Sequence, residues 1–153
     1  MSEESTIPDL VELEALYRTA LPDGTDVAHV AHDDAAWATL SRASAALYAP
    51  DFVYEDSVVP DHRGDAYRGF EGYRRAVATF TEPFEEMIYD LERLAACGDR
   101  VVAIYRVRAT ARHTGLRFDQ QAAYVLSFRG GMISHVRAYR DPDEALKAAW
   151  RAD

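Results

Sequence analysis

A strand predicted over residues 116–129 carries two polar groups on an otherwise apolar face. Alternate residues of a strand point to the same side, so one side groups Phe118, Gln120, Ala122, Tyr124, Leu126 and Phe128. The amide of Gln120 and the phenol of Tyr124 can hydrogen-bond a small molecule, which the apolar neighbours would enclose. This pattern is typical of a ligand-cavity wall, and equally of an ordinary core face.

Three arginines alternate along the preceding predicted strand, at Arg106, Arg108 and Arg112. Such a row favours a solvated face or a subunit interface. If the row faces inward instead, Arg106 can bind an anionic substrate or pair with an acid. Both alternatives stay open at this point.

The remaining reactive side chains form no pattern of a metal site or an activated nucleophile. Cys97 is the only cysteine, so no internal disulfide forms. The histidines are scattered without metal-ligand spacing. We therefore expect neither a metal nor a cofactor.

Composition narrows the class of protein. A length of 153 residues indicates one domain. The formal net charge of −9, from 26 acidic and 17 basic residues, argues against nucleic-acid binding, which depends on neutralising phosphates. Residues 1–8 are acidic and polar, with no signal-peptide pattern, and no apolar run is long enough for a membrane span. These features predict a disordered tail over 1–8 and a cytoplasmic protein without membrane partners.

Periodicity and turn residues predict helices first and hairpins afterwards. Asp9 suits the N-cap of a helix that Pro22-Asp23-Gly24 closes, and a loop follows. The helices are expected from Asp9 to 21, from Asp33 or Asp34 to Tyr48 with Pro50 ending it, over 69–84, and from 141 to about 150. The strands are expected over 52–57, 86–95, 100–113, 116–129 and 132–140, with a loop over 59–68.

This order predicts an α+β fold with an antiparallel sheet, rather than alternating βαβ units. A sheet folded over helices leaves a cavity at its open end, which is a normal place for a ligand.

Four segments carry a resemblance to a known family: 47–56 (LYAPDFVYED), 67–72 (YRGFEG), 128–133 (FRGGMI) and 139–142 (YRDP). From about residue 9 to 150 the chain resembles the NTF2-like superfamily, in its SnoaL-like and ketosteroid-isomerase-like branch. The resemblance implies a cone in which a curved antiparallel sheet wraps around the N-terminal helices, as a single domain over 9–153. It also implies a homodimer that pairs through the outer face of the sheet.

The same resemblance implies roles for particular residues. The general base of steroid isomerases falls on Asp56 of the Glu55-Asp56 pair, and the oxyanion-binding tyrosine falls on Tyr17. Their protonated aspartic acid aligns with Tyr124, which departs from the pattern but can also donate. Tyr54 and Val136 are expected to line the pocket with the residues of the 116–129 face.

Limonene-type epoxide hydrolases of this fold offer a second comparison. Their water-holding pair matches Tyr54 and Asp56, and their arginine matches Arg106. Their two catalytic aspartates fall on Arg108 and Ala138, so the resemblance disfavours that mechanism.

Proton removal beside a carbonyl needs a base at one end and preorganised donors at the other. The prediction is a cofactor-independent isomerase, cyclase or dehydratase that acts by acid/base chemistry on a small apolar carbonyl compound. The alternative is a module of the same fold that only binds a small hydrophobic molecule or only dimerises. The fold hosts all of these, so it does not choose among them.

Overall fold

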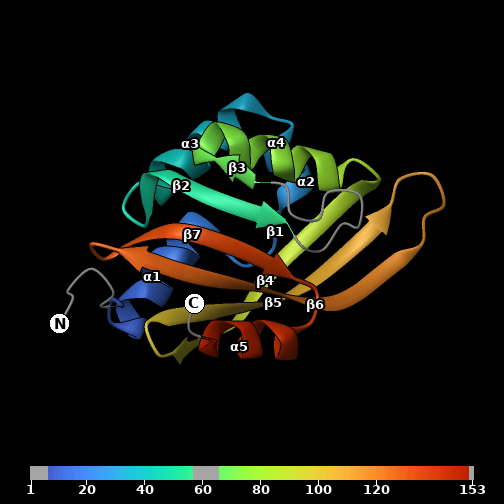
Figure 1. Ribbon diagram of the computed structural model, residues 1–153. Helices are drawn as coiled ribbons and strands as arrows, with labels where there is room; N and C mark the ends of the chain where they lie inside the picture. The colour runs from blue at the N-terminus through green and yellow to red at the C-terminus, as the bar shows by residue number, and fades with distance from the viewer. Residues whose placement is uncertain (1–6, 57–65, 152–153) are drawn as a thin grey trace.

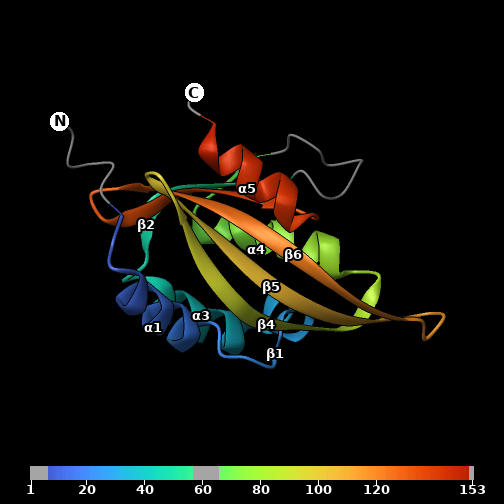
Figure 2. The same cartoon turned by 90° about the horizontal axis from the view of Figure 1, so that it is seen from below.

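The computed structural model describes residues 7–56 and 66–151. Within these residues, seven strands form a strongly curved half-barrel, and the helices α1 to α4 lie on its concave side (Figures 1 and 2). The strands follow the order β1-β4-β5-β6-β7-β2-β3. Their bounds are β1 Thr25–Asp26, β2 Tyr48–Asp56, β3 Ala66–Arg68, β4 Phe84–Cys97, β5 Arg100–Ala111, β6 Arg117–Arg129 and β7 Met132–Tyr139.

The helices begin where the sequence offers a cap. They are α1 Leu10–Ala20, α2 Val27–Ala31, α3 Asp34–Ser44, α4 Gly69–Thr81 and α5 Pro142–Trp150. The carboxylates of Asp9, Asp26, Asp33 and Asp141 accept backbone N–H groups at the starts of α1, α2, α3 and α5. The predicted cap at Asp9 is therefore confirmed, and of the two candidates Asp33 and Asp34 the helix uses Asp33.

Two apolar clusters lie on opposite faces of the sheet. The larger one fills the concave side, where Phe52, Val101 and Leu126 are fully buried among residues from α1, α2 and α4. The smaller one joins α5 to the outer face through Val102, Ile104 and other residues. The two clusters use alternate residues of β5, as a strand buried on both faces requires.

The α+β cone is confirmed, with one departure in the sheet: β2 pairs with β7 in parallel, whereas the remaining strand pairs are antiparallel. The helix predicted to reach Tyr48 ends at Ser44, and β2 begins at Tyr48. Pro50 therefore lies inside a strand. Its register shifts between Tyr48 and Val53, so the missing N–H of Pro50 falls where the ladder with β7 is interrupted.

The segment predicted as a loop before the second helix contains β1 and α2, which cover the edge of β4. Strand β3 occupies the end of the predicted 59–68 loop; the rest of that loop and tail residues 1–6 lie outside the described residues. Ile7, at the end of the predicted tail, packs against the concave core. None of the described helices is both long and apolar enough to cross a bilayer.

Gly72 on α4 controls how closely this helix approaches β3. A Cβ at Gly72 would lie 3.1 Å from the carbonyl carbon of Tyr67 and 3.3 Å from its Cβ. We expect Gly72→Ala to destabilise the fold by about 1–3 kcal/mol, since the backbone contact outweighs the helix propensity that alanine gains. Thermal unfolding measures this, and a higher Tm in the variant would mean that Tyr67 moves aside without cost.

Candidate functional site

Two cavities lie one behind the other inside the half-barrel. The outer cavity has a volume of about 320 Å³ and is walled by the end of β2, by β4 to β7 and by the end of α4. The inner cavity has a volume of about 60 Å³ and lies under α1 to α4. Phe80, Tyr89 and Tyr124 line both cavities and therefore form the partition between them.

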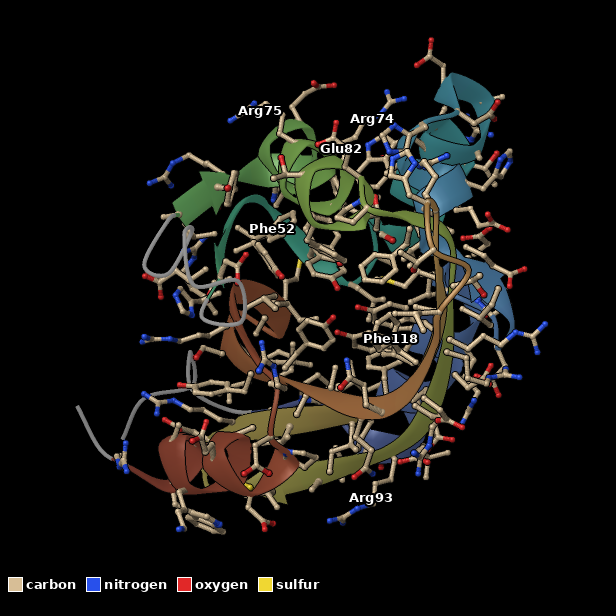
Figure 3. The ribbon with its side chains drawn as sticks, turned by 90° about the vertical axis from the view of Figure 1, so that its right-hand side faces the viewer. Phe52, Arg74, Arg75, Glu82, Arg93 and Phe118 are labelled. Carbon is tan, nitrogen blue, oxygen red and sulfur yellow. The ribbon has the colours of Figure 1, made fainter. Side chains whose placement is uncertain are left out.

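The outer cavity reaches the surface at its wide end. Phe118 is 41% exposed there, and Gln120 and Arg140 are exposed beside it. In Figure 3, Phe118 lies on the inner side of the curved sheet, whereas Arg93 points outward. A ligand can therefore enter past Phe118.

Asp56 is the only acidic residue among the described residues that line the outer cavity. Its side chain is 5% exposed at the end of β2, and Tyr54 lies on the same face of that strand. The parallel pairing with β7 sets Asp56 opposite Ala138, which in turn pairs with Tyr124 on β6. The structure thus brings Asp56, Tyr54 and Tyr124 together.

Tyr89 and Tyr124 supply a hydroxyl pair to this cavity. Their hydroxyl oxygens lie 2.9 Å apart, so one hydroxyl donates to the other, and the acceptor keeps its own hydrogen for a ligand. Burial raises the pKa of Tyr89 to about 12; its hydrogen bond with Tyr124 lowers the pKa, and the charge of Asp56 raises it. Burial also raises the pKa of Tyr124 well above its ordinary value. Both phenols are therefore neutral donors at physiological pH.

Tyr17 lies in the inner cavity and not beside Asp56. Its hydroxyl lies 3.3 Å from that of Tyr48, and the Tyr89–Tyr124 pair stands between it and the outer cavity. Val136, predicted to line the pocket, also lines the inner cavity. The donors nearest to the outer cavity come from β4 and β6 rather than from α1.

Gln120 and Ala122 line the outer cavity, in agreement with the predicted face of β6. Leu126 and Phe128 of the same face line neither cavity, so their prediction as substrate-binding residues is wrong. They lie toward the closed end of the cone, where Leu126 is fully buried and Phe128 is 8% exposed in the core. Residues that share a strand face need not share a depth in the cone.

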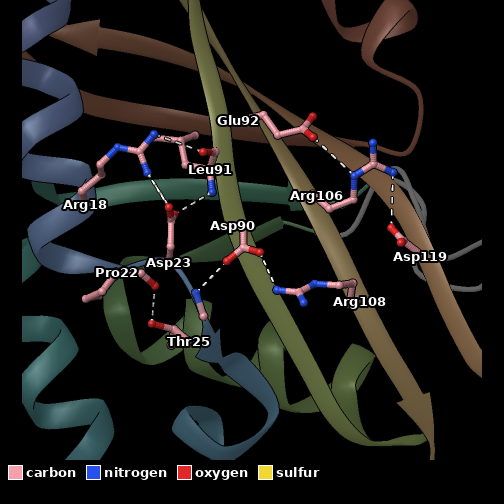
Figure 4. Close-up of polar contacts among 11 residues, drawn as sticks. Arg18, Pro22, Asp23, Thr25, Asp90, Leu91, Glu92, Arg106, Arg108 and Asp119 are labelled. Carbon is pink, nitrogen blue, oxygen red and sulfur yellow. Dashed lines mark hydrogen bonds and ion pairs between the residues drawn. The ribbon is translucent and has the colours of Figure 1, made fainter.

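Arg106 lies on the outer face of the sheet, so its prediction as a substrate-binding residue is also wrong. Its neighbours Tyr105 and Val107 point inward, and alternation turns Arg106 outward. Its guanidinium donates to Glu92 and Asp119 at 3.3 Å each, and Arg108 pairs with Asp90 (Figure 4). Homodimerisation through this outer face stays a prediction. The ion pairs of Arg106 and Arg108 lie on the same face.

Sequence reasoning missed Tyr89, which lies outside the four segments that carry the family resemblance. A signal was present in the alternation of Met87, Tyr89 and Leu91 along β4, all of which are buried in the concave core. Met87 lines the outer cavity as well. In the described part of the chain, no three His, Cys, Asp or Glu side chains are grouped so that they could hold a metal ion.

The fold and this cavity define a SnoaL-like protein. The family model for the SnoaL-like domain matches residues 23–136, and the chain belongs to that family. A search among proteins of curated function finds no match.

Solved structures share the fold at low sequence identity. A proposed SnoaL-like polyketide cyclase from Jannaschia sp. CCS1 is 18% identical, with a TM-score of 0.61 over 95% of this chain and 96% of that one. A protein with a ketosteroid-isomerase-like fold from Catenulispora acidiphila, in complex with trimethylamine, is 21% identical, with a TM-score of 0.55 over 88% and 86%. A proposed polyketide cyclase from Acidithiobacillus ferrooxidans is 25% identical, with a TM-score of 0.50 over 71% and 83%.

Proposed function

We propose that this chain is a cofactor-independent enzyme of the isomerase, cyclase or dehydratase type, which acts on a small apolar carbonyl compound in the outer cavity. The observation that carries the proposal is the single buried carboxylate of Asp56 in a cavity shared with the Tyr89–Tyr124 hydroxyl pair. The volume of about 320 Å³ lies at the lower end of the range for ligand pockets, which favours a small substrate. The proposed polyketide cyclases among the structural relatives agree with this class of reaction.

In the proposed mechanism, the carboxylate of Asp56 removes a proton from the carbon next to the substrate carbonyl. The C–H electron pair moves into the new C=C bond, and the carbonyl oxygen becomes an enolate oxygen. That oxygen accepts a hydrogen bond from the hydroxyl of the Tyr89–Tyr124 pair whose hydrogen is free. The hydrogen bond inside the pair makes this hydroxyl a stronger donor. Return of the proton from Asp56 to another carbon gives isomerisation. Attack of the enolate carbon on a second carbonyl, whose oxygen takes that proton, gives cyclisation. Loss of a β-hydroxyl, which takes the proton and leaves as water, gives dehydration.

All three outcomes begin with the same proton abstraction, so one assay tests them together. We expect the protein to accelerate exchange of the α-protons of α-tetralone, an apolar bicyclic ketone, for deuterium in D2O, followed by NMR. Binding of 2-naphthol, which resembles the enol of such a ketone, is measured in parallel by calorimetry. Tight 2-naphthol binding without any exchange would contradict the proposed enzymatic activity and favour the alternative of a module that only binds its ligand.

The hydroxyl pair has its own test in Tyr124→Phe. This change keeps the ring that packs on Tyr105 at 5.6 Å and removes one partner of the pair. We expect the exchange rate to fall about tenfold to a hundredfold, less than the hundredfold to thousandfold typical of a fully lost oxyanion donor, because Tyr89 keeps its hydroxyl. The same change at Tyr17, which lies behind the partition, should have a much smaller effect on α-tetralone. Equal effects of the two variants would contradict the assignment of the donor to the Tyr89–Tyr124 pair.

A further inference from the structure

The inner cavity is lined by six of the nine tyrosines of the chain, all nine of which lie in the described residues. They are Tyr17, Tyr48, Tyr73, Tyr89, Tyr105 and Tyr124. The rest of the wall is almost entirely apolar, with Trp37 and Phe70 among the larger side chains. A space of about 60 Å³ is too small for a whole ligand, but it suits the end of one.

The hydroxyls around this cavity are not all paired with one another. Tyr17 pairs with Tyr48, and Tyr89 pairs with Tyr124, which leaves one spare hydrogen in each pair. The hydroxyl of Tyr105 makes no hydrogen bond to any of the described residues, although its side chain is only 3% exposed. The oxygen of this hydroxyl is not sealed inside the protein, because Oγ of Ser41 is the only sealed side-chain polar atom without a partner among the described residues. It therefore faces the space of the inner cavity, where it can donate a hydrogen bond to a polar atom that enters.

Tyr105 is held as a donor by its surroundings. Its ring packs against those of Tyr89 at 5.3 Å and Tyr124 at 5.6 Å, so it lies directly behind the partition. Burial raises its pKa well above the ordinary value, and the nearby phenols Tyr48, Tyr73 and Tyr89 raise it further. The hydroxyl is therefore protonated at any physiological pH and offers its hydrogen to an acceptor.

The partition is formed by three aromatic residues. Phe80 lies near the end of α4 and is only partly buried, and it lines both cavities with Tyr89 and Tyr124. A rotation of the Phe80 ring would join the two spaces without a change in the backbone.

We propose that the inner cavity is a second compartment of the ligand site, and that Tyr105 in it donates a hydrogen bond to an oxygen at the far end of the ligand. The ligand class is a compact ring compound with two oxygens at opposite ends. One oxygen lies in the outer cavity by the Tyr89–Tyr124 pair, and a hydroxyl or carbonyl at the other end passes Phe80. The proposal depends on the proposed function in one respect only, namely the assignment of the reacting end of the ligand to the outer cavity.

The experiment compares naphthalene-2,6-diol with 2-naphthol, which lacks the second oxygen, by calorimetry. We expect the wild-type protein to bind the diol on the order of tenfold more tightly, the effect of one hydrogen bond. Tyr105→Phe should reduce this ratio to about one. Tyr54→Phe is the matched control, since it removes a hydroxyl that lines the outer cavity only, and it should preserve the ratio.

If the Tyr105 hydroxyl only stabilised the fold, Tyr105→Phe would lower Tm and the preference for the diol would survive. If the hydroxyl binds the ligand, its removal should leave Tm unchanged or raise it, because it has no protein partner to lose. The preference for the diol should then be lost. Equal affinity of the wild-type protein for both compounds, or a preference that survives in Tyr105→Phe, would overturn the proposal. The α-tetralone assay separates the failure of this proposal from the failure of the proposed function. A preference for the diol without proton exchange would support the inner compartment and contradict only the proposed enzymatic activity.

Discussion

Asp56→Asn is expected to lower the rate of α-proton exchange by about 10²- to 10⁴-fold, the contribution typical of a positioned general base. The amide has nearly the shape of the carboxylate but cannot accept the substrate proton. Because Asp56 is 5% exposed at the end of a strand that the sheet holds on both sides, the substituted side chain should keep its place. Binding of 2-naphthol should therefore change little while exchange is lost.

The chain offers a matched control one residue away. Glu55 lies on the opposite face of β2, where its carboxylate is 2.7 Å from Nε2 of His135 on β7. Glu55→Gln makes the same chemical change outside the cavity and should leave the exchange rate within about twofold of the wild type. Exchange at the wild-type rate in Asp56→Asn, or an equal loss in Glu55→Gln, would contradict the role of Asp56 as the base.

The second large effect concerns alkaline stability. Burial raises the pKa of seven described tyrosines, namely Tyr17, Tyr48, Tyr54, Tyr73, Tyr89, Tyr105 and Tyr124. In the unfolded chain each ionises near pH 10, whereas in the folded chain the pKa of Tyr89 is about 12. Below pH 10 both states hold these protons, so stability is unaffected. Above pH 10 the unfolded state releases protons first, and stability falls as pH rises.

Each such tyrosine lowers the free energy of unfolding by about 1.4 kcal/mol per pH unit in this window. Seven together give a slope of roughly 10 kcal/mol per pH unit, comparable to the whole stability of a typical domain. We expect cooperative unfolding near pH 11, with tyrosinate absorbance at 295 nm rising together with the loss of circular dichroism. Tyr105→Phe should reduce the slope by about one seventh. Gradual ionisation of the seven phenols from pH 10 with the fold intact would contradict this prediction.

The sequence predicted those parts of the fold that local chemistry determines. Asp9 caps its helix as expected, and one of the two expected candidates, Asp33, caps the second helix. The alternation along β6 identified Gln120, Ala122 and Tyr124 as cavity residues. The pairing of Tyr54 and Asp56 on one face of β2 follows from the same period of two. These are statements about neighbours in the chain, which spacing alone can make.

What could not be predicted depends on contacts between distant segments. The depth of Leu126 and Phe128 in the cone, the separation of Tyr17 from Asp56, and the role of Tyr89 follow from how the sheet curves. Irregularities in register between Leu91 and Arg93 and between Ser127 and Phe128 contribute to that curvature. The parallel contact of β2 was hidden because Pro50 is typical of a helix end.

That parallel contact has a consequence for how the chain acquires its site. The hairpins β4–β5, β5–β6 and β6–β7 join neighbouring segments, whereas β2 must wait for β7, which is made much later. Closing such a long loop costs more chain entropy than closing a hairpin, so this contact should form late in folding. On the ribosome, Asp56 would emerge early and remain without its framework until β7 is synthesised. A chain that ends before Met132 should therefore leave β2 without the strand that sets Asp56 opposite Ala138, however well its hairpins form.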